Sequence, residues 1–184
     1  MSTEGGPRRR LTPVDNYDDH LPSWSRDGQR IYFTSKRSGD EQIWKVAATG
    51  GTPIQVTKQG GRIAYESADG QFVYYAKGQE VFGIWRIPVN GGDEVPVLDT
   101  VNGYWGNWVV RPDGIYYIEP NTKNGAAIEF FSFSSRRITE VLSLGKVEVS
   151  WGGLAISPDG KSVIYALVEQ AGSDIMLVEN YIGQ

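Results

Sequence analysis

The sequence predicts an all-β protein built from four copies of a small antiparallel unit, and three observations lead to this fold class. The 184 residues include 23 Gly, 6 Trp, 10 Tyr and 6 Phe, a composition that favours strands and tight turns over helices. An Asp-Gly pair recurs along the whole chain, with its Asp at positions 27, 69, 113 and 159. No long segment shows the 3.6-residue apolar spacing of an amphipathic helix.

Each repeat contains the pattern of four short strands. The Asp-Gly pair joins two strand-like runs in every repeat, as a hairpin turn does, because Gly tolerates positive φ. A third run follows in each repeat (42–46, 83–87, 128–133 and 174–178), and a fourth comes after a second turn in three of them (53–57, 95–98 and 137–142). Four strands in 40–50 residues form the blade of a β-propeller. A β-sandwich has similar turn spacing but does not need a long sequence repeat.

The two ends of the chain complement each other in strand count. The last repeat has no fourth run after about Glu179, whereas Arg9–Thr12 resembles the fourth run Ile54–Thr57 but belongs to no repeat. We therefore expect the N-terminal strand to complete the last blade and to satisfy two exposed sheet edges. The predicted boundaries are a disordered or vector-derived segment at 1–7 and a propeller at 8–183, with the extra strand at 8–12 and blades at about 21–57, 62–99, 104–142 and 151–179.

These motifs resemble the WD-repeat-like blades of the TolB β-propeller family. The resemblance covers about residues 8–183 and is carried by Pro22–Ser35, Gln42–Val46, Gly50–Thr57 and Ser157–Lys161. Blades two and three depart from the pattern at Ser67–Gly70 and Val110–Ile115. Two stretches, Gly103–Trp108 and Ser173–Asn180, are similar to the C-terminal blades behind some bacterial winged-helix regulators and Ser/Thr kinases. In those proteins the propeller is an accessory region that senses or binds.

The number of blades raises the question of how the ring closes. TolB-like propellers commonly have six or more blades, and an open arc of four would leave two apolar sheet faces uncovered, each on the order of 400–600 Å². A tight four-bladed ring is one solution. The preferred solution is an eight-bladed ring from two chains with two-fold symmetry, a homodimer in which Arg9–Thr12 of each chain completes the last blade of the other by strand exchange. In a four-bladed ring, each sheet must turn through about 90° relative to the next, which is crowded for the large aromatic side chains on the sheet faces.

Catalytic motifs are scarce, so the chain is predicted not to be an enzyme and no catalytic residue, metal or cofactor is assigned. There is one histidine, His20, and no cysteine. The Gly pairs at 50–51 and 91–92 sit before strands as turns rather than as a phosphate loop, and no Gly-x-Ser-x-Gly nucleophile motif is present. The acidic group Asp15, Asp18 and Asp19 lacks the spacing of a helix-loop-helix calcium site and is expected to be a solvated turn.

A candidate binding site emerges when the repeats are aligned on their Asp-Gly turns. Residues just before the inner strands then come together, where loops of a propeller surround the channel entrance. The candidate ligand-binding residues at this mouth are His20, Arg62, Tyr104, Trp105 and Trp151, and their aromatic and basic groups suit a peptide, a protein or a small polar ligand. Irregular loops with partly buried Trp are the alternative. Trp24, Trp44 and Trp85 hold equivalent strand positions and are expected to pack between blades.

Charge and hydropathy narrow the partners. The net charge is −4 and the longest basic run is Arg8–Arg10, so nucleic-acid binding is not expected. No apolar run reaches the ~20 residues of a membrane span, and the polar start lacks the apolar core of a signal peptide. The resemblance allows a periplasmic or extracytoplasmic location. The predicted function is a non-catalytic propeller module that binds a protein or small ligand and assembles through blade contacts. The alternative is a structural or engineered half-propeller whose main property is ring assembly.

Overall fold

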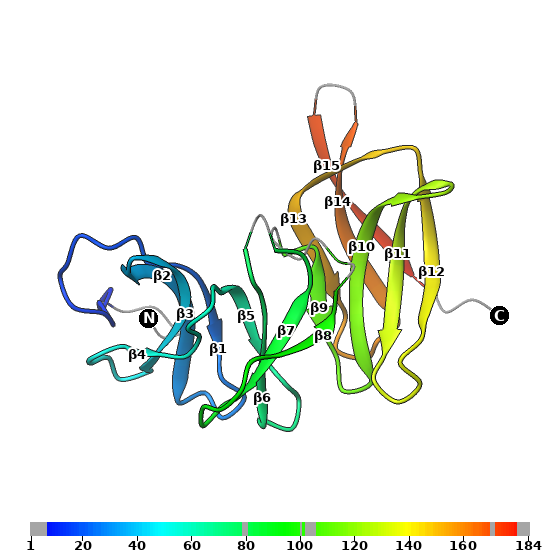
Figure 1. The fold of residues 1–184 in the computed structure, drawn as a ribbon. Helices are drawn as coiled ribbons and strands as arrows, with labels where there is room; N and C mark the ends of the chain where they lie inside the picture. Colours follow the sequence, from blue (N-terminus) through cyan, green and yellow to red (C-terminus); the bar gives the residue numbers. More distant parts are fainter. Residues whose placement is uncertain (1–6, 79–80, 100, 102–105, 170–171, 180–184) are drawn as a thin grey trace.

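The computed structural model describes residues 7–78, 81–99, 101, 106–169 and 172–179. These residues form fifteen strands in four antiparallel sheets and no helix (Figure 1). In particular, the described residues contain no helix that could cross a membrane. The predicted all-β fold with four propeller blades is confirmed.

Each sheet follows chain order, from an inner strand to an outer one. Blade 1 consists of β1 (His20–Trp24), β2 (Arg30–Ser38), β3 (Asp40–Ala47) and β4 (Ile54–Gln55). Blade 2 consists of β5 (Arg62–Glu66), β6 (Phe72–Ala76), β7 (Ile84–Pro88) and β8 (Val95–Leu98). Blade 3 consists of β9 (Trp108–Val110), β10 (Gly114–Thr122), β11 (Gly125–Ser132) and β12 (Ile138–Gly145). Blade 4 has β13 (Glu148–Ile156), β14 (Ser162–Glu169) and β15 (Gly172–Glu179).

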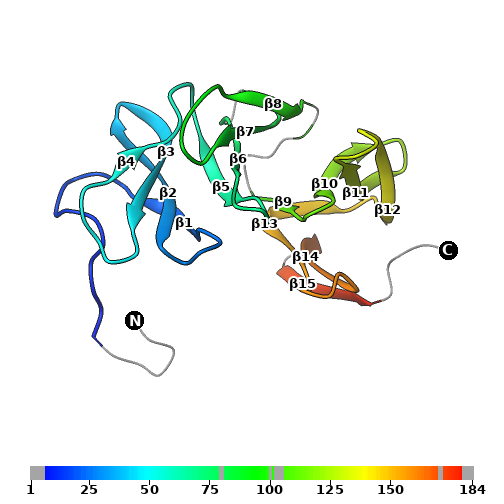
Figure 2. The ribbon, with the colours of Figure 1, turned by 90° about the horizontal axis from the view of Figure 1, so that it is seen from below.

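The inner strands β1, β5, β9 and β13 converge on a common centre, and β4, β8 and β12 lie at the periphery (Figure 2). Contacts between blades run mainly through these inner strands, from β1 to β5, from β5 to β9 and from β9 to β13. This arrangement brings four segments that are far apart in the sequence to one place in the molecule.

The Asp-Gly turns explain why the repeat is visible in the sequence. In blade 1, Ser25 Oγ donates a hydrogen bond of 2.6 Å to Asp27 Oδ1, which also accepts one of 2.9 Å from the Gln29 amide. The same Ser–Asp hydrogen bond recurs in blades 2 and 4, and it lowers the pKa of all three Asp carboxyls. Gly28, at φ +68°, supplies the left-handed residue that the turn requires.

Blade 3 departs from this turn in length but keeps an arginine that contacts the next blade. The connection between the paired residues Val110 and Ile115 is residues 111–114, whereas in blade 1 it is the longer segment 25–30. Arg111 stands in the shorter turn and donates hydrogen bonds to the carbonyls of Ser157 (3.3 Å) and Pro158 (3.2 Å) in blade 4. In the longer turn of blade 1, Arg26 likewise donates a hydrogen bond of 3.4 Å to the Ser67 carbonyl of blade 2, so both turns link neighbouring blades.

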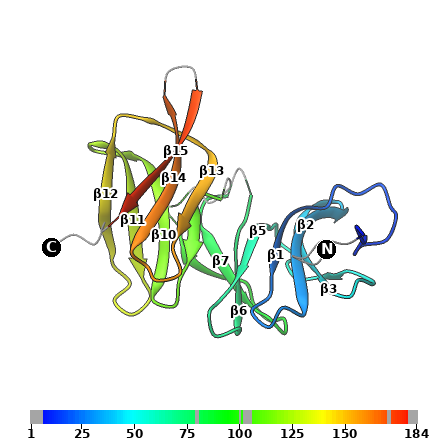
Figure 3. The ribbon, with the colours of Figure 1, turned by 180° about the vertical axis from the view of Figure 1, so that it is seen from behind.

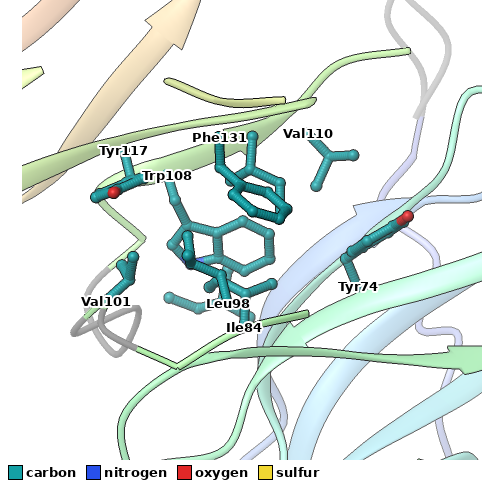
Figure 4. Packing of buried hydrophobic residues seen from close by; sticks show 10 residues of the cluster. Tyr74, Ile84, Leu98, Val101, Trp108, Val110, Tyr117 and Phe131 are labelled. Atoms are coloured by element: carbon teal, nitrogen blue, oxygen red, sulfur yellow. The ribbon is translucent and has the colours of Figure 1, made fainter. Parts of the chain in front are cut away.

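Apolar clusters fill the three spaces between neighbouring blades. One joins blades 1 and 2 around Tyr32, Ile43 and Tyr75, and another joins blades 3 and 4 around Ile128 and Val163. The cluster between blades 2 and 3 is centred on Trp108, which is fully buried and lies among Ile84, Leu98 and Phe131 (Figure 4). The Tyr65 ring meets the Trp108 ring edge-on at a centroid distance of 4.9 Å. Aromatic burial of this kind holds the blades in their angular positions.

The N-terminal segment differs from the prediction. Residues 8–12 form no strand and do not complete the last blade of their own chain. The Arg9 guanidinium donates hydrogen bonds to the carbonyls of Ala48 (2.6 Å) and Thr49, and the Leu11 carbonyl accepts one of 3.1 Å from Gly51. Leu11 packs on the outer face of blade 1 with Ile31, Phe33 and Val46. The segment therefore packs on the apolar face of blade 1, which lies close to it in the chain. Blade 4 has three strands among the described residues.

The tryptophans also divide differently from the prediction. Trp85 packs against the apolar cluster shared by blades 1 and 2, as expected for a blade contact. Trp44 packs with Leu11 on the outer face of blade 1, so it does not lie between two blades. Trp24, by contrast, is 64% exposed at the end of β1, directly before the Asp-Gly turn. The expectation that Trp24 packs between blades is wrong.

Candidate ligand-binding site at the propeller centre

A hollow of about 190 Å³ lies at the centre of the propeller, where the inner strands meet. Residues of all four repeats line it: Leu21, Pro22, Ser23, Ile63, Ala64, Tyr65, Gly106, Gly152 and Gly153. The wall is mainly apolar and small, with backbone groups close to the surface. Such a central hollow is the position at which a propeller can contact one ligand from several blades at once.

The inner strands are bulged where they line this hollow. The ladder of β1 shifts register between His20 and Ser23, and that of β5 shifts between Arg62 and Ala64. Within these bulges Leu21 has φ +53° and Ile63 has φ +48°. Left-handed backbone costs a non-glycine residue on the order of 1–2 kcal/mol, and it is rarest for a β-branched residue such as Ile63. Bulges of this kind interrupt the ladder and redirect neighbouring side chains.

The repeated bulge places His20 and Arg62 on either side of Glu41. The Arg62 guanidinium Nη1 lies 2.9 Å from both carboxylate oxygens of Glu41. The Nε2 atom of His20 lies 3.6 Å from Glu41 Oε1, and its Nδ1 lies 3.2 Å from the Asp18 carbonyl. The three side chains of this group are 14–25% exposed, so they are partly shielded but still open to a ligand.

Gly61 fixes the position of Arg62 next to Glu41. The Gly61 amide donates a 3.0 Å hydrogen bond to the Glu41 carbonyl, so the link between blades 1 and 2 runs directly against the start of β3. A Cβ at position 61 would lie 2.6 Å from Thr57 Oγ1 and 2.9 Å from Ile43 Cγ1. Since backbone atoms can approach this closely only without a side chain, glycine is required at this crossing.

The structure brings together two of the five residues predicted from the sequence, His20 and Arg62. Tyr104 and Trp105 lie outside the described residues. Trp151 belongs to β13, but its side chain also lies outside what the structure describes. Glu41 was missed because it opens a third strand rather than an inner one. Its negative charge could have pointed to it, because Glu41 is the carboxylate that lies beside both Arg62 and His20.

The acidic group that precedes β1 binds an arginine. Arg37 Nη2 lies 2.6 and 2.7 Å from the two carboxylate oxygens of Asp19, and Arg37 Nη1 lies 3.6 Å from Asp15. Burial alone would raise the pKa of Asp19, but hydrogen bonds from Arg37, Ser35 and Thr12 outweigh it and hold this pKa below its usual value. The described residues contain no group of three or more acidic, His or Cys side chains placed to hold a metal ion.

No protein-family model matches this sequence. Among curated proteins, the chain is 26% identical to dipeptidyl-peptidase 5 of Porphyromonas endodontalis, over 98% of this chain and 26% of that protein. It is 27% identical to the uncharacterized protein Atu1656 of Agrobacterium fabrum, over 62% of this chain and 43% of that protein. The chain thus spans less than half the length of either curated relative.

Solved structures identify the fold. TolB from Acinetobacter baumannii superposes with a TM-score of 0.70 and 17% identity, over 88% of this chain and 40% of TolB. The fold is that of a TolB-like β-propeller. A second TolB structure, from Agrobacterium tumefaciens, has a TM-score of 0.64 with 19% identity over 89% of this chain and 62% of its own. The resemblance inferred from the Asp-Gly motifs is therefore confirmed.

The same comparisons correct one prediction. Structures with this TolB-like fold include an oligogalacturonate lyase from Vibrio parahaemolyticus (TM-score 0.66, 16% identity, 91% of this chain and 55% of the lyase). They also include a Mycobacterium tuberculosis puromycin-hydrolyzing peptidase (TM-score 0.61, 14% identity, 89% of this chain and 29% of the peptidase). Together with the relative named dipeptidyl-peptidase 5, these enzymes contradict the prediction that the chain is not an enzyme. Proteins with this fold include enzymes, so the fold does not support that prediction.

Proposed function

We propose that this TolB-like propeller is a recognition module that binds a peptide at its centre, beside Glu41, Arg62 and His20. The observation that carries the proposal is the Glu41 carboxylate, held at 2.9 Å by Arg62 and 3.6 Å from His20. Arg62 and His20 belong to the bulged strands β5 and β1, which line the central hollow. The curated relative named dipeptidyl-peptidase 5 supports a peptide as the ligand class. The module would serve a longer protein or an assembly, as the larger size of the relatives suggests.

The chemistry of this site fits the two ends of a peptide. A carboxylate such as Glu41 pairs with an ammonium group, and a guanidinium such as Arg62 pairs with a carboxylate through two parallel hydrogen bonds. Partial burial strengthens such interactions, because the local dielectric constant is lower than in water. The apolar wall of the hollow, with Leu21 and Ile63, suits the body of an apolar side chain.

The test is a titration of the chain with the dipeptide Ala-Phe, followed by amide NMR shifts. We expect shifts in Ala64 and Tyr65, and binding at least about tenfold weaker for Glu41→Gln and Arg62→Gln, because each loses a charge-assisted hydrogen bond. Asp40→Asn is the matched control, since Asp40 is exposed and adjacent to Glu41. Equal affinity of the control and the two site variants, or an unshifted spectrum, would overturn the proposal.

A second candidate function, ring assembly with another copy of the chain, is favoured by the outer face of blade 4. Ile175 is 80% exposed, Leu177 59% and Ile164 42%, and Ile164 pairs with Leu177 across β14 and β15. Figure 3 shows β14 and β15 on the near side of the molecule with no described segment in front of them. In the proposed ring, residues 8–12 of a second copy leave the outer face of their own blade 1 and pair with the edge of β15. The face of blade 1 that they uncover then packs on the exposed face of blade 4.

Sedimentation velocity tests the assembly. We expect a species of twice the 20.4 kDa chain mass, and a shift to the monomer when Ile175 and Leu177 are both replaced by Asp, because charges cannot be buried in that interface. Val14→Asp is the control, as Val14 is 85% exposed on a segment outside the sheets. A monomer at all accessible concentrations would rule out the ring.

A further inference from the structure

A second hollow, of about 350 Å³, lies between blades 2 and 3, away from the central site. The Asp-Gly turns of the two blades border it on one side through Ser67–Asp69 and Arg111, and β8 borders it through Val95–Val97. It is continuous with a hollow of about 310 Å³ that shares Pro96, Val97 and Arg136. The volume lies within the range of small-molecule sites.

One wall of this inter-blade pocket is aromatic. The rings of Tyr74 and Phe133 stack with a centroid distance of 5.5 Å and an interplanar angle of 19°, and both rings line the pocket with Phe72. Tyr74 stands at the edge of the Trp108 cluster with its hydroxyl pointing away from Trp108 (Figure 4). A flat apolar group can therefore lie against this wall without disturbing the core.

The rest of the pocket is basic. Arg86, Arg111 and Arg136 line it. Arg111 is already bound to the carbonyls of Ser157 and Pro158, whereas none of the ion pairs among described residues includes Arg86 or Arg136. Two carboxylates border these hollows. Asp69 lines the pocket, its Oδ1 atom accepts hydrogen bonds from Ser67 and the Gln71 amide, and the Arg86 charge contributes to its lowered pKa; Asp99 lines the connected hollow. Three guanidinium groups therefore face two carboxylates.

Aromatic rings position the two available guanidinium groups. The Arg86 guanidinium carbon lies 4.3 Å from the Phe72 ring centroid, and that of Arg136 lies 5.7 Å from the Phe131 centroid. Arg136 also has φ +55°, an unusual backbone conformation for a non-glycine residue. Side chains held over rings lose less conformational freedom when a ligand binds. The site is thus partly arranged before any ligand arrives.

We propose that this inter-blade pocket binds a carboxylate ligand with a flat apolar body. The carboxylate pairs with Arg86 and Arg136, whose planar guanidinium groups match its geometry, and the body packs against the Tyr74–Phe133 stack. This proposal is independent of the peptide site at the propeller centre, because the two hollows share no residue.

Three matched probes test the proposal by NMR titration: phenylacetate, its neutral amide phenylacetamide, and acetate. We expect phenylacetate to shift the amides of Tyr74, Val97 and Phe133 and to bind at least about tenfold more tightly than the other two, because phenylacetamide lacks the charge and acetate lacks the ring. Equal binding of all three probes, or no shift at these amides, would overturn it. A full displacement of phenylacetate by equimolar inorganic phosphate would also contradict the proposal, because the aromatic ring would then contribute nothing to the binding affinity.

Arginine variants complete the test. Arg86→Gln and Arg136→Gln are each expected to weaken phenylacetate binding about tenfold or more, and Arg86→Lys is expected to weaken it as well, because Lys lacks the planar fork. Arg137→Gln serves as the control, since Arg137 is exposed and does not line the pocket. Unchanged binding in the Arg86 and Arg136 variants, with the folded spectrum retained, would place phenylacetate elsewhere and defeat the proposal.

Discussion

Blades 1 and 4 each have an apolar sheet face that points away from the other blades, and the two faces differ in how far they are covered. On blade 1 the outer apolar residues Ile31, Phe33 and Val46 are 8%, 4% and 3% exposed, because Leu11 and Trp44 pack over them. On blade 4 the outer residues Ile175 and Leu177 are 80% and 59% exposed. The two faces are opposite sides of the blade, because Ile175 and Leu177 hold the repeat positions of Ile43 and Lys45. The N-terminal segment covers the outward face at one end, and no described segment covers the outward face at the other.

The covered end depends on one buried cation. Arg37 lies 5.4 Å from the ring centroids of Tyr17 and Phe33 and 5.3 Å from that of Trp44, and its charge is matched by Asp19. It thereby links the N-terminal segment to the face of the first blade. The terminal units of a repeat protein need a cap over their outer face. On blade 1, Leu11 and the Arg37 side chain belong to this cap.

The largest expected effect is loss of the covered face itself. Phe33→Ala is predicted to lower the free energy of unfolding by about 3–5 kcal/mol, because it leaves a cavity in a packed cluster. Urea unfolding followed by tryptophan fluorescence measures the change. Phe82→Ala is the control, since Phe82 is 55% exposed and should cost much less. Similar losses for both would mean that the N-terminal segment does not protect blade 1.

The next effect comes from removing the buried cation. Arg37→Met keeps much of the volume but leaves Asp19 without its charge partner, and we expect a loss of about 2–4 kcal/mol in the same unfolding assay. Lys36→Met is the matched control, because Lys36 is exposed and adjacent in β2. A loss below that of the control would show that Arg37 does not hold the N-terminal segment on blade 1.

A pH titration sharpens the role of Asp19. Its pKa in the folded protein lies below the usual value of 3.8, where burial is outweighed by the hydrogen bonds from Arg37, Ser35 and Thr12. A lowered pKa stabilises the fold above the unfolded-state value, and this stabilisation is lost as pH falls through the folded-state value. The stability difference between the wild type and Arg37→Met should therefore narrow below about pH 4. A constant difference from pH 7 to pH 3 would contradict this assignment.

The smallest expected effect is at the uncovered end. Leu177→Ala should change the free energy of unfolding by less than about 0.5 kcal/mol when measured on dilute chain, because a 59% exposed side chain loses little burial. Val163→Ala, at a fully buried position of the same blade, is the comparison and should cost several times more. A large loss in Leu177→Ala at low concentration would mean that this face is already covered by another part of the chain.

The sequence predicted the blades because local chemistry defines them. The Ser–Asp hydrogen bond and the positive φ of Gly28 are satisfied within a few residues, and the same Ser–Asp bond forms in blades 2 and 4. The turn is therefore encoded locally in three of the four repeats. The position of residues 8–12 could not be predicted from local sequence in the same way. Their similarity to Ile54–Thr57 predicted a strand, but an apolar residue such as Leu11 is compatible with an edge or a face, and the covered face was the nearer partner.

The candidate site was predicted in part for a related reason. Aligning the repeats placed His20 and Arg62 at equivalent positions, and the propeller brought them together because its inner strands converge. Glu41 has no equivalent in that alignment, since it meets Arg62 across the link at Gly61. Contacts between different strand classes depend on how the blades are set side by side, which the repeat spacing does not encode.

The three inter-blade clusters have a thermodynamic consequence, since each is shared by two neighbouring blades. The stability of such a molecule approaches a sum of nearest-neighbour terms, so the free energy of opening should rise from blade to blade, starting at the bare end. Hydrogen exchange would be fastest in β15 and slowest around Trp108 and Tyr75. A molecule of this type can gain or lose one terminal unit while the remaining interfaces keep their energies.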